Sequence, residues 1–186
     1  LAGMTSLTTL VPEENLGIVV LTNQETSVQT ALTYWILDSY FEAPRTDWTA
    51  VQRQAAEQRW VRRIAPKLEA IEKSRIPSTA TSLKLSDYAG RYTDTLYGEA
   101  LIEQNDKILR LRFAKSPPFD ARLDHWHYDT FVARFDHHSI ADAFVSFSLG
   151  PDRAIEEMLM KPYSPTADSS YDYEALRFVP MEKAQE

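Results

Sequence analysis

The sequence has no cysteine, which excludes disulfide bonds, thiolate metal sites and cysteine nucleophiles. It is also short of positive charge: 20 Lys and Arg stand against 27 Asp and Glu, a formal net charge of −7 at pH 7. A general nucleic-acid surface needs clustered cations, so this balance argues against one. The longest strongly apolar run, Gly17 to Leu21, is far shorter than the roughly 20 residues of a membrane span. We therefore expect neither a nucleic-acid partner nor a membrane-spanning helix.

The first residues, Leu1-Ala2-Gly3, carry neither an initiator methionine nor the charged start of a signal peptide. They begin inside a strand-like pattern. The sequence therefore predicts the later part of a longer protein.

Two β-rich runs open the chain, Met4 to Val11 and Leu16 to Thr22, with the turn-forming cluster Pro12-Glu13-Glu14-Asn15 between them. The second run is apolar at consecutive positions. That pattern is typical of a strand covered on both faces, so we expect it to lie inside a sheet.

Helices are predicted next. Thr26 and Gln29 fit the capping box of a first helix, and Pro44 closes it. Apolar residues at three- and four-residue steps predict a long amphipathic helix over 47–75, which Pro66 should kink or split. Its cations indicate a solvated face balanced by glutamates rather than an anion-binding site: Arg59, Arg62, Arg63 and Lys67. Residues 76–82 have the composition of a linker.

The last region, about 85–180, is rich in short β patterns. Leu109, Leu111 and Phe113 alternate with Arg110 and Arg112, and similar sets recur after turn signals. Seven or eight strands at spacings of roughly 8 to 12 residues indicate an antiparallel barrel or sandwich. A region of about 95 residues is long enough to bury its own core.

Two stretches carry a family resemblance. The turn Pro12-Glu13-Glu14-Asn15 followed by Gly17-Ile18-Val19-Val20-Leu21-Thr22-Asn23 resembles the C-terminal strands of serine β-lactamase-related hydrolases, which include class C β-lactamases and penicillin-binding proteins. Leu85-Ser86-Asp87-Tyr88-Ala89-Gly90-Arg91-Tyr92 resembles the opening of the lipocalin-like tail domain that some of these hydrolases carry. The two matches occur in the order expected of such a protein.

The resemblance implies an α+β chain in three parts. Residues 1–45 would be the two C-terminal strands and a helix of a β-lactamase-like domain, and residues 46–84 an amphipathic connector helix and linker. Residues 85–182 would form an antiparallel, lipocalin-like β-barrel of about eight strands. It also implies a bacterial protein in the periplasm or outside the cell.

The chemistry that the resemblance implies is acyl transfer by an activated serine. It requires Ser-x-x-Lys, Tyr-x-Asn or Ser-x-Asn, and Lys-x-Gly or His-x-Gly, and none of these motifs occurs in the sequence. We therefore predict no catalytic residue, no cofactor and no enzymatic activity for this chain alone. The parent protein is expected to be a serine hydrolase acting on β-lactams, peptides or esters.

Histidines are the remaining candidates for a site. His125, His127 and Asp129 would share one face of a straight strand, as metal ligands do, with His137-His138 one hairpin away. Tyr128-Asp129-Thr130 has the composition of a turn, which would scatter them. The sequence thus predicts no metal, with His125 and His127 as candidate ligands should one bind.

The leading interpretation is a non-catalytic C-terminal fragment whose barrel modulates the hydrolase cleft or its assembly, with the upstream catalytic domain as partner. The alternative is a small-molecule-binding barrel with a helical appendage, in which aromatic side chains enclose an apolar ligand. A stand-alone hydrolase with an unrecognised site is a third. Because two strands do not make a stable sheet, residues 1–45 should pack on the barrel through their helices or self-associate through the N-terminal strands.

Overall fold

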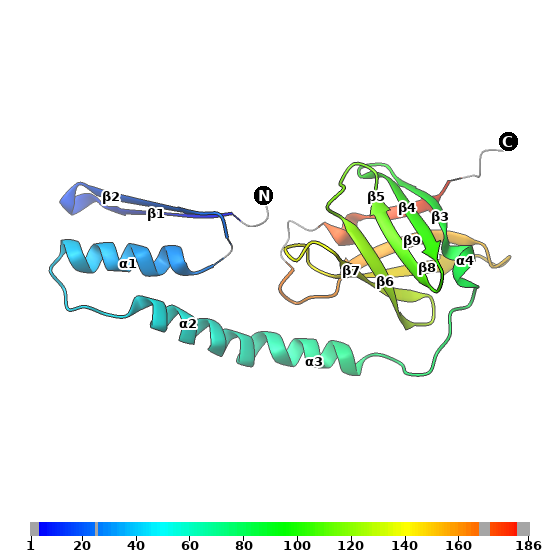
Figure 1. The fold of residues 1–186 in the computed structure, drawn as a ribbon, viewed down its shortest axis with the longest axis horizontal. Coiled ribbons are helices and arrows are strands. Elements are labelled where there is room, and N and C mark those ends of the chain that lie inside the picture. Colours follow the sequence, from blue (N-terminus) through cyan, green and yellow to red (C-terminus); the bar gives the residue numbers. More distant parts are fainter. Residues whose placement is uncertain (1–3, 25, 168–171, 182–186) are drawn as a thin grey trace. The chain divides into compact units, whose positions relative to one another are not determined.

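The computed structural model describes residues 4–24, 26–167 and 172–181. The chain divides into two compact units, Leu1–Pro66 and Lys67–Glu186 (Figure 1). The boundary falls within the long helix that the sequence predicts over 47–75. Among the described residues, no helix is long and apolar enough to cross a lipid bilayer.

The first unit begins with a two-stranded antiparallel hairpin. Strands β1 (Thr5–Val11) and β2 (Leu16–Thr22) pair along their whole length. A short 3₁₀ helix (Pro12–Glu14) joins them, and Asn15 closes it in the left-handed conformation, with φ at 52°. Asparagine tolerates this conformation better than most residues, so the predicted turn is confirmed.

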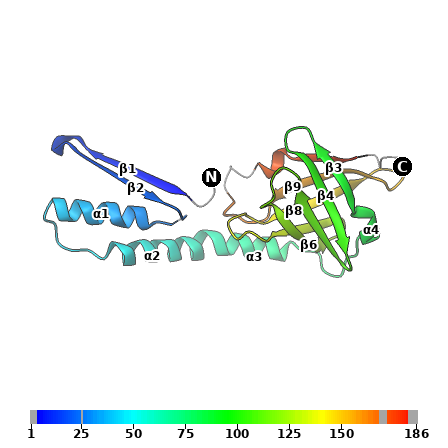
Figure 2. The same cartoon turned by 45° about the horizontal axis from the view of Figure 1, so that its top comes forward.

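Helix α1 (Val28–Tyr40) lies along one face of this hairpin (Figures 1 and 2). Ile18 is buried, whereas the alternate residues Val19 and Leu21 are 62% and 74% exposed on the opposite face. Leu10 is exposed as well. The cover that the apolar run predicts on both faces is therefore present on one face only in the described part of the chain.

The predicted capping box of α1 is wrong. The N-cap of the helix is Ser27, so the position that could complete the box is Thr30 rather than Gln29. The Thr26 hydroxyl accepts a hydrogen bond from the Val28 N–H at 3.3 Å. The buried Oε1 of Gln29 has no hydrogen-bond partner among the described residues.

The second predicted helix comprises three segments: α2 (Trp48–Arg59), a π-helical stretch η2 (Trp60–Ile64) and α3 (Ala65–Lys73). Asp47 caps its start by accepting the Ala50 N–H at 3.0 Å. At Pro66 the helix continues: the Ala65 N–H bonds the Trp60 carbonyl in the π pattern. The wider turn accommodates the proline ring, which would clash with the Arg62 carbonyl in a regular α-helix.

The second unit is a closed barrel of eight antiparallel strands, which confirms the predicted fold class. Their order is β10-β3-β4-β5-β6-β7-β8-β9, so neighbours in the chain are neighbours in the barrel, and β10 closes it against β3. A short helix, α4 (Leu85–Tyr88), precedes the barrel, and a 3₁₀ turn, η3 (Tyr173–Ala175), precedes its last strand. The strands are β3 (Gly90–Asp94), β4 (Gly98–Asn105), β5 (Ile108–Phe113), β6 (Asp120–His127), β7 (Thr130–Phe135), β8 (Ala143–Leu149), β9 (Ile155–Pro162) and β10 (Arg177–Pro180).

The barrel interior is filled with side chains. Leu109, Leu111 and Phe113 of β5 are buried in it, as their alternation with arginines predicts. Tyr88 of α4 is fully buried in this core and packs edge-to-face against Phe131 and Phe147.

A smaller apolar cluster lies on the outside of the barrel. A bulge between His125 and His127 interrupts the β6–β7 register, and Trp126 packs outward with Val132 and Tyr163 rather than into the main core. Leu68 and Ile71 of α3 pack against this cluster. The last half of the long helix is thereby part of the barrel unit.

Candidate functional site

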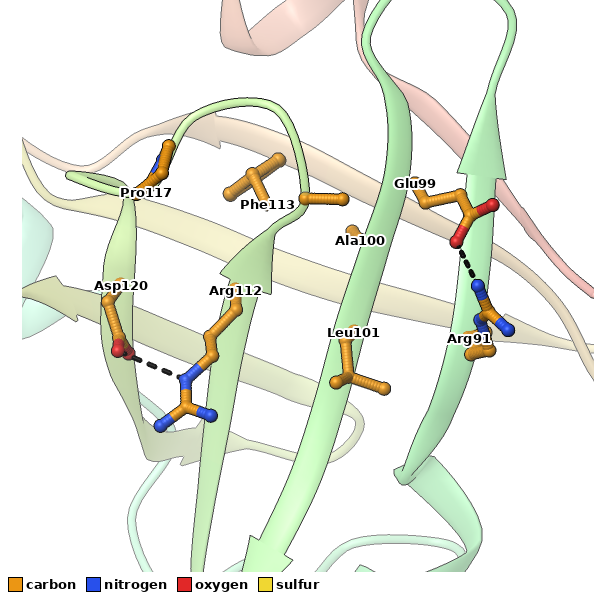
Figure 3. A pocket seen from close by; sticks show the side chains of 9 residues that line it. Arg91, Glu99, Ala100, Leu101, Arg112, Phe113, Pro117 and Asp120 are labelled. Atoms are coloured by element: carbon orange, nitrogen blue, oxygen red, sulfur yellow. Dashed lines mark hydrogen bonds and ion pairs between the residues drawn. The ribbon is translucent and has the colours of Figure 1, made fainter.

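A shallow groove of about 600 Å³ crosses the outer surface of the barrel over β3 to β6 (Figure 3). Strand register aligns its central residues: Arg91 lies opposite Leu101, Leu101 opposite Arg112, and Arg112 opposite Asp120. Leu101 forms an apolar floor, with an arginine ion pair on each side.

In each ion pair, an arginine of the groove is paired with a carboxylate of the same groove. Arg91 bonds Glu99, and the Arg112 Nε lies 3.1 Å from Asp120 Oδ2. Arg110 adds a second contact to Asp120 at 2.6 Å. Burial acts to raise the pKa of Asp120, but the hydrogen bonds and charges of the two arginines outweigh it and hold the pKa below its ordinary value.

The charge state of Asp120 limits the proton-transfer chemistry of this groove. A carboxylate held ionised by arginines is a poor proton donor near neutral pH. The described residues that line the groove include no serine, threonine, histidine or lysine: Arg91, Glu99, Ala100, Leu101, Arg112, Phe113, Ala114, Pro117 and Asp120. Guanidinium groups beside an apolar side chain are typical of protein-binding surfaces.

A second hollow lies at one end of the barrel. It measures about 70 Å³ and is lined by Tyr97, Phe119 and Tyr173 among others. The Tyr97 hydroxyl donates to Asp172 at 3.2 Å. Pockets for small organic ligands typically measure about 300 to 1,000 Å³, so this hollow is too small for one.

The structure separates the histidines that the sequence proposes as possible metal ligands. His125 Nε2 lies 2.9 Å from the Tyr128 carbonyl oxygen, and His127 Nδ1 accepts the Ile76 N–H at 3.3 Å. Tyr128 has a positive φ of 45° in the turn between β6 and β7. Within the part of the chain that the structure describes, no three His, Asp or Glu side chains are grouped so as to hold a metal ion. His137 lies apart, bonded to Ser139.

Asp129, in the same turn, has a role that the sequence did not reveal. It accepts hydrogen bonds from the Tyr88 hydroxyl and from both the N–H and the hydroxyl of Ser82, at 2.8 and 2.7 Å. Burial favours a raised pKa, but these bonds prevail and lower the pKa of Asp129. The segment predicted as a linker is thus attached to the barrel, with Thr79 Oγ1 accepting the Tyr128 N–H at 3.1 Å.

Comparison with known proteins identifies this second unit. The family described as Domain of unknown function (DUF3471) matches residues 74–180. The chain belongs to the DUF3471 family. The match begins at the end of α3 and covers all eight strands of the barrel, so the DUF3471 domain contains both the groove and the Asp129 turn.

A solved structure described as the C-terminal domain of penicillin binding protein Rv0907 is similar to the DUF3471 chain. The similarity covers 57% of this chain and 94% of the other, with 20% identity and a TM-score of 0.42. The comparison with curated proteins gave no match.

Proposed function

We propose that this chain is the C-terminal part of a serine β-lactamase-like hydrolase and that its DUF3471 barrel is a non-catalytic accessory module. The observation that carries the proposal is the hairpin of the first unit. Its residues carry the hydrolase motif, and its structure leaves surfaces that need a larger domain.

Within the described residues, the hairpin has no neighbouring strand, and one of its two faces is uncovered. In the described residues β1 pairs only with β2, so each strand keeps one free edge. Val19 and Leu21 project from the face that α1 does not cover. An isolated hairpin is marginally stable in water, and exposed strand edges favour aggregation. An upstream domain that adds strands and a second layer would satisfy both requirements.

The barrel supports an accessory role. Its interior is filled, and among the described residues the groove over β3 to β6 is lined by apolar side chains and arginine–carboxylate ion pairs. Such a surface can cover or shape the hydrolase cleft, or mediate assembly. The family resemblance of the motifs supports a periplasmic or extracellular location.

The small-molecule-binding alternative has less support. It needs a ligand-sized cavity in the barrel, whereas the described residues fill the interior and leave about 70 Å³ at one end. Native mass spectrometry of the purified chain tests it directly, because a co-purified lipid would favour this alternative.

The proposal is tested with the longer protein and with this chain alone. We expect the longer protein to form a covalent adduct with a fluorescent penicillin or to cleave an ester reporter, and this chain to do neither. Deleting the barrel from the longer protein should change the kinetics, the substrate range or the oligomeric state. Turnover by this chain would contradict the non-catalytic assignment, and three unchanged properties after deletion would contradict the accessory role.

A further inference from the structure

The end of α2 and the π-helical stretch η2 form a basic surface. Residues 58–68 contain four cations and no Asp or Glu. Arg59, Arg62 and Arg63 are exposed, and none of them forms an ion pair within the described residues. The three side chains are solvated, as the sequence-based interpretation predicts, and no glutamate among the described residues lies within ion-pair distance of them.

The arginines of the barrel behave differently. Six of them pair with carboxylates of the same unit: Arg91, Arg110, Arg112, Arg122, Arg134 and Arg177. Along the helix, Arg59 has like charges three and four positions away, at Arg62 and Arg63. Such spacings place side chains next to one another, and like charges there repel. No ion pair within the described residues offsets this repulsion.

Two large apolar side chains lie within the same five residues. Trp60 is 50% exposed and Val61 66% exposed. Farther along the helix, Leu68 and Ile71 are covered by the outer cluster of the barrel. The apolar residues of α3 are therefore covered, whereas Trp60 and Val61, in the preceding stretch η2, are exposed.

We propose that the basic surface, Arg59 to Arg63, docks on an acidic surface of the upstream hydrolase domain, with Trp60 and Val61 at the centre of the contact. This inference rests on the proposed function. These arginines have no ion-pair partner among the described residues, so an acidic surface of another domain can pair with them. Exposed arginine and tryptophan are typical of the energetically dominant residues in protein interfaces.

The first unit indicates which partner the basic surface contacts, because this unit contains both the basic surface and the hairpin. Helix α2 is joined to α1 by a hydrogen bond from the Trp48 indole to Asp38 at 2.6 Å and by the contact of Trp48 with Tyr34. Helix α1 in turn covers one face of the hairpin. An upstream domain that completes the hairpin's sheet would therefore bind the same unit that carries the basic surface.

The test uses the absence of cysteine from the chain. Val61→Cys introduces the single thiol of this chain and the same thiol into the longer protein, and peptide mass spectrometry measures the maleimide labelling of this position in both. We expect labelling to be at least about tenfold slower in the longer protein, because the rate scales with the fraction of time that the thiol is uncovered. Lys107→Cys, in the β4–β5 turn, should label equally fast in both.

Charge reversal then tests the chemistry of the contact. Arg59→Glu, Arg62→Glu and Arg63→Glu together should restore fast labelling of Cys at position 61 in the longer protein. The matched control reverses three exposed barrel cations with the same change in net charge, Lys84→Glu, Lys107→Glu and Lys161→Glu, and should leave the protection intact. Equal labelling in the two proteins, or protection that survives reversal of the arginines, would overturn the inference.

A third measurement distinguishes a lipid surface. Protection of the thiol in this chain by phosphatidylglycerol vesicles, without protection in the longer protein, would overturn the inference and assign the basic surface to anionic lipid. The proposed function fails separately, when the longer protein lacks Ser-x-x-Lys and forms no adduct with a fluorescent penicillin.

Discussion

Single side chains decide how the barrel holds the segments around it. Leu68 and Ile71 join α3 to Trp126 and Tyr163, and the Tyr163 hydroxyl donates to Glu72. The Arg75 guanidinium lies 5.4 Å from the centre of the Trp126 ring and donates to the Trp126 carbonyl at 2.9 Å. Apolar, aromatic and charged contacts therefore all act at one small site.

Leu68→Ala should lower the free energy of unfolding of residues 67–186 by about 1–3 kcal/mol, less than for a fully buried leucine because the side chain is only partly buried. Urea denaturation followed by tryptophan fluorescence measures this loss. The control is Leu96→Ala, since Leu96 is 76% exposed and its truncation should cost no more than about 0.5 kcal/mol. Equal losses in the two variants would show that α3 does not stabilise the barrel.

Because of Asp129, the free energy of unfolding should decrease at acidic pH. Its pKa is lowered in the folded chain, so its contribution is complete above the unfolded aspartate pKa of about 3.9 and is lost as the pH falls through the folded value. We therefore expect Asp129→Asn to lose less stability than the unmodified chain between about pH 4 and about pH 2. Thermal melts across this range measure the difference.

The control for that experiment is Asp106→Asn in the exposed β4–β5 turn, where asparagine also tolerates the positive φ of 53°. This variant should follow the pH dependence of the unmodified chain. Parallel curves for all three proteins would mean that the Tyr88 and Ser82 hydrogen bonds do not depend on the charge of Asp129.

At the scale of elements, the π-helical stretch shows how a proline is tolerated inside a helix. Pro66→Ala restores an N–H that can bond the Arg62 carbonyl, so we expect η2 to shift toward a regular α-helix. Backbone amides of residues 62–65 should then exchange with deuterium more slowly. The control Ala65→Ser leaves the proline in place and should not slow exchange. Unchanged exchange in Pro66→Ala would show that the π turn has another cause.

Elements governed by short-range patterns could be predicted from the sequence. The hairpin, its Asn15 turn and the inward–outward alternation of β5 all follow from residue type and spacing. The capping box failed because Thr26 and Ser27 both have hydroxyls, and only the helix start distinguishes them. The attachment of the linker could not be predicted, because Ser82 and Asp129 are 47 residues apart.

The outer groove was equally inaccessible from the sequence. Arg110 and Arg112 could be recognised as outward-facing residues of a strand. Their partner Asp120 is set by the register of β5 with β6, which depends on how the barrel closes. The bulge beside Trp126 likewise depends on the pairing of β6 with β7, and it disrupts the straight strand on which the metal hypothesis for His125 and His127 depended.

At the scale of the molecule, the barrel unit should fold without the first unit. Residues 67–186 should unfold cooperatively, whereas residues 74–186, which correspond to the start of the family match, lose Leu68 and Ile71 and should be less stable by about 2–4 kcal/mol. Calorimetry or denaturant titration of the two truncated chains measures this. Equal stability would place the domain boundary after α3.

The first unit should self-associate when it lacks its upstream partner. Its exposed sheet face is apolar, so Val19→Lys with Leu21→Lys should weaken association of this chain in sedimentation velocity. The control Leu96→Lys with Ile108→Lys adds the same charge at exposed barrel positions and should not. A chain that is monomeric at all concentrations would contradict this prediction.

The order of strands in the barrel has a consequence during synthesis. Each of β4 to β9 pairs with the strand made just before it, so these hairpins can form as the chain leaves the ribosome. Closure waits for β10, the short strand that pairs with both β9 and β3 and buries Phe178. Until it emerges, two open edges can capture a neighbouring nascent chain, so the newly made domain depends on its last strand to stay a single molecule.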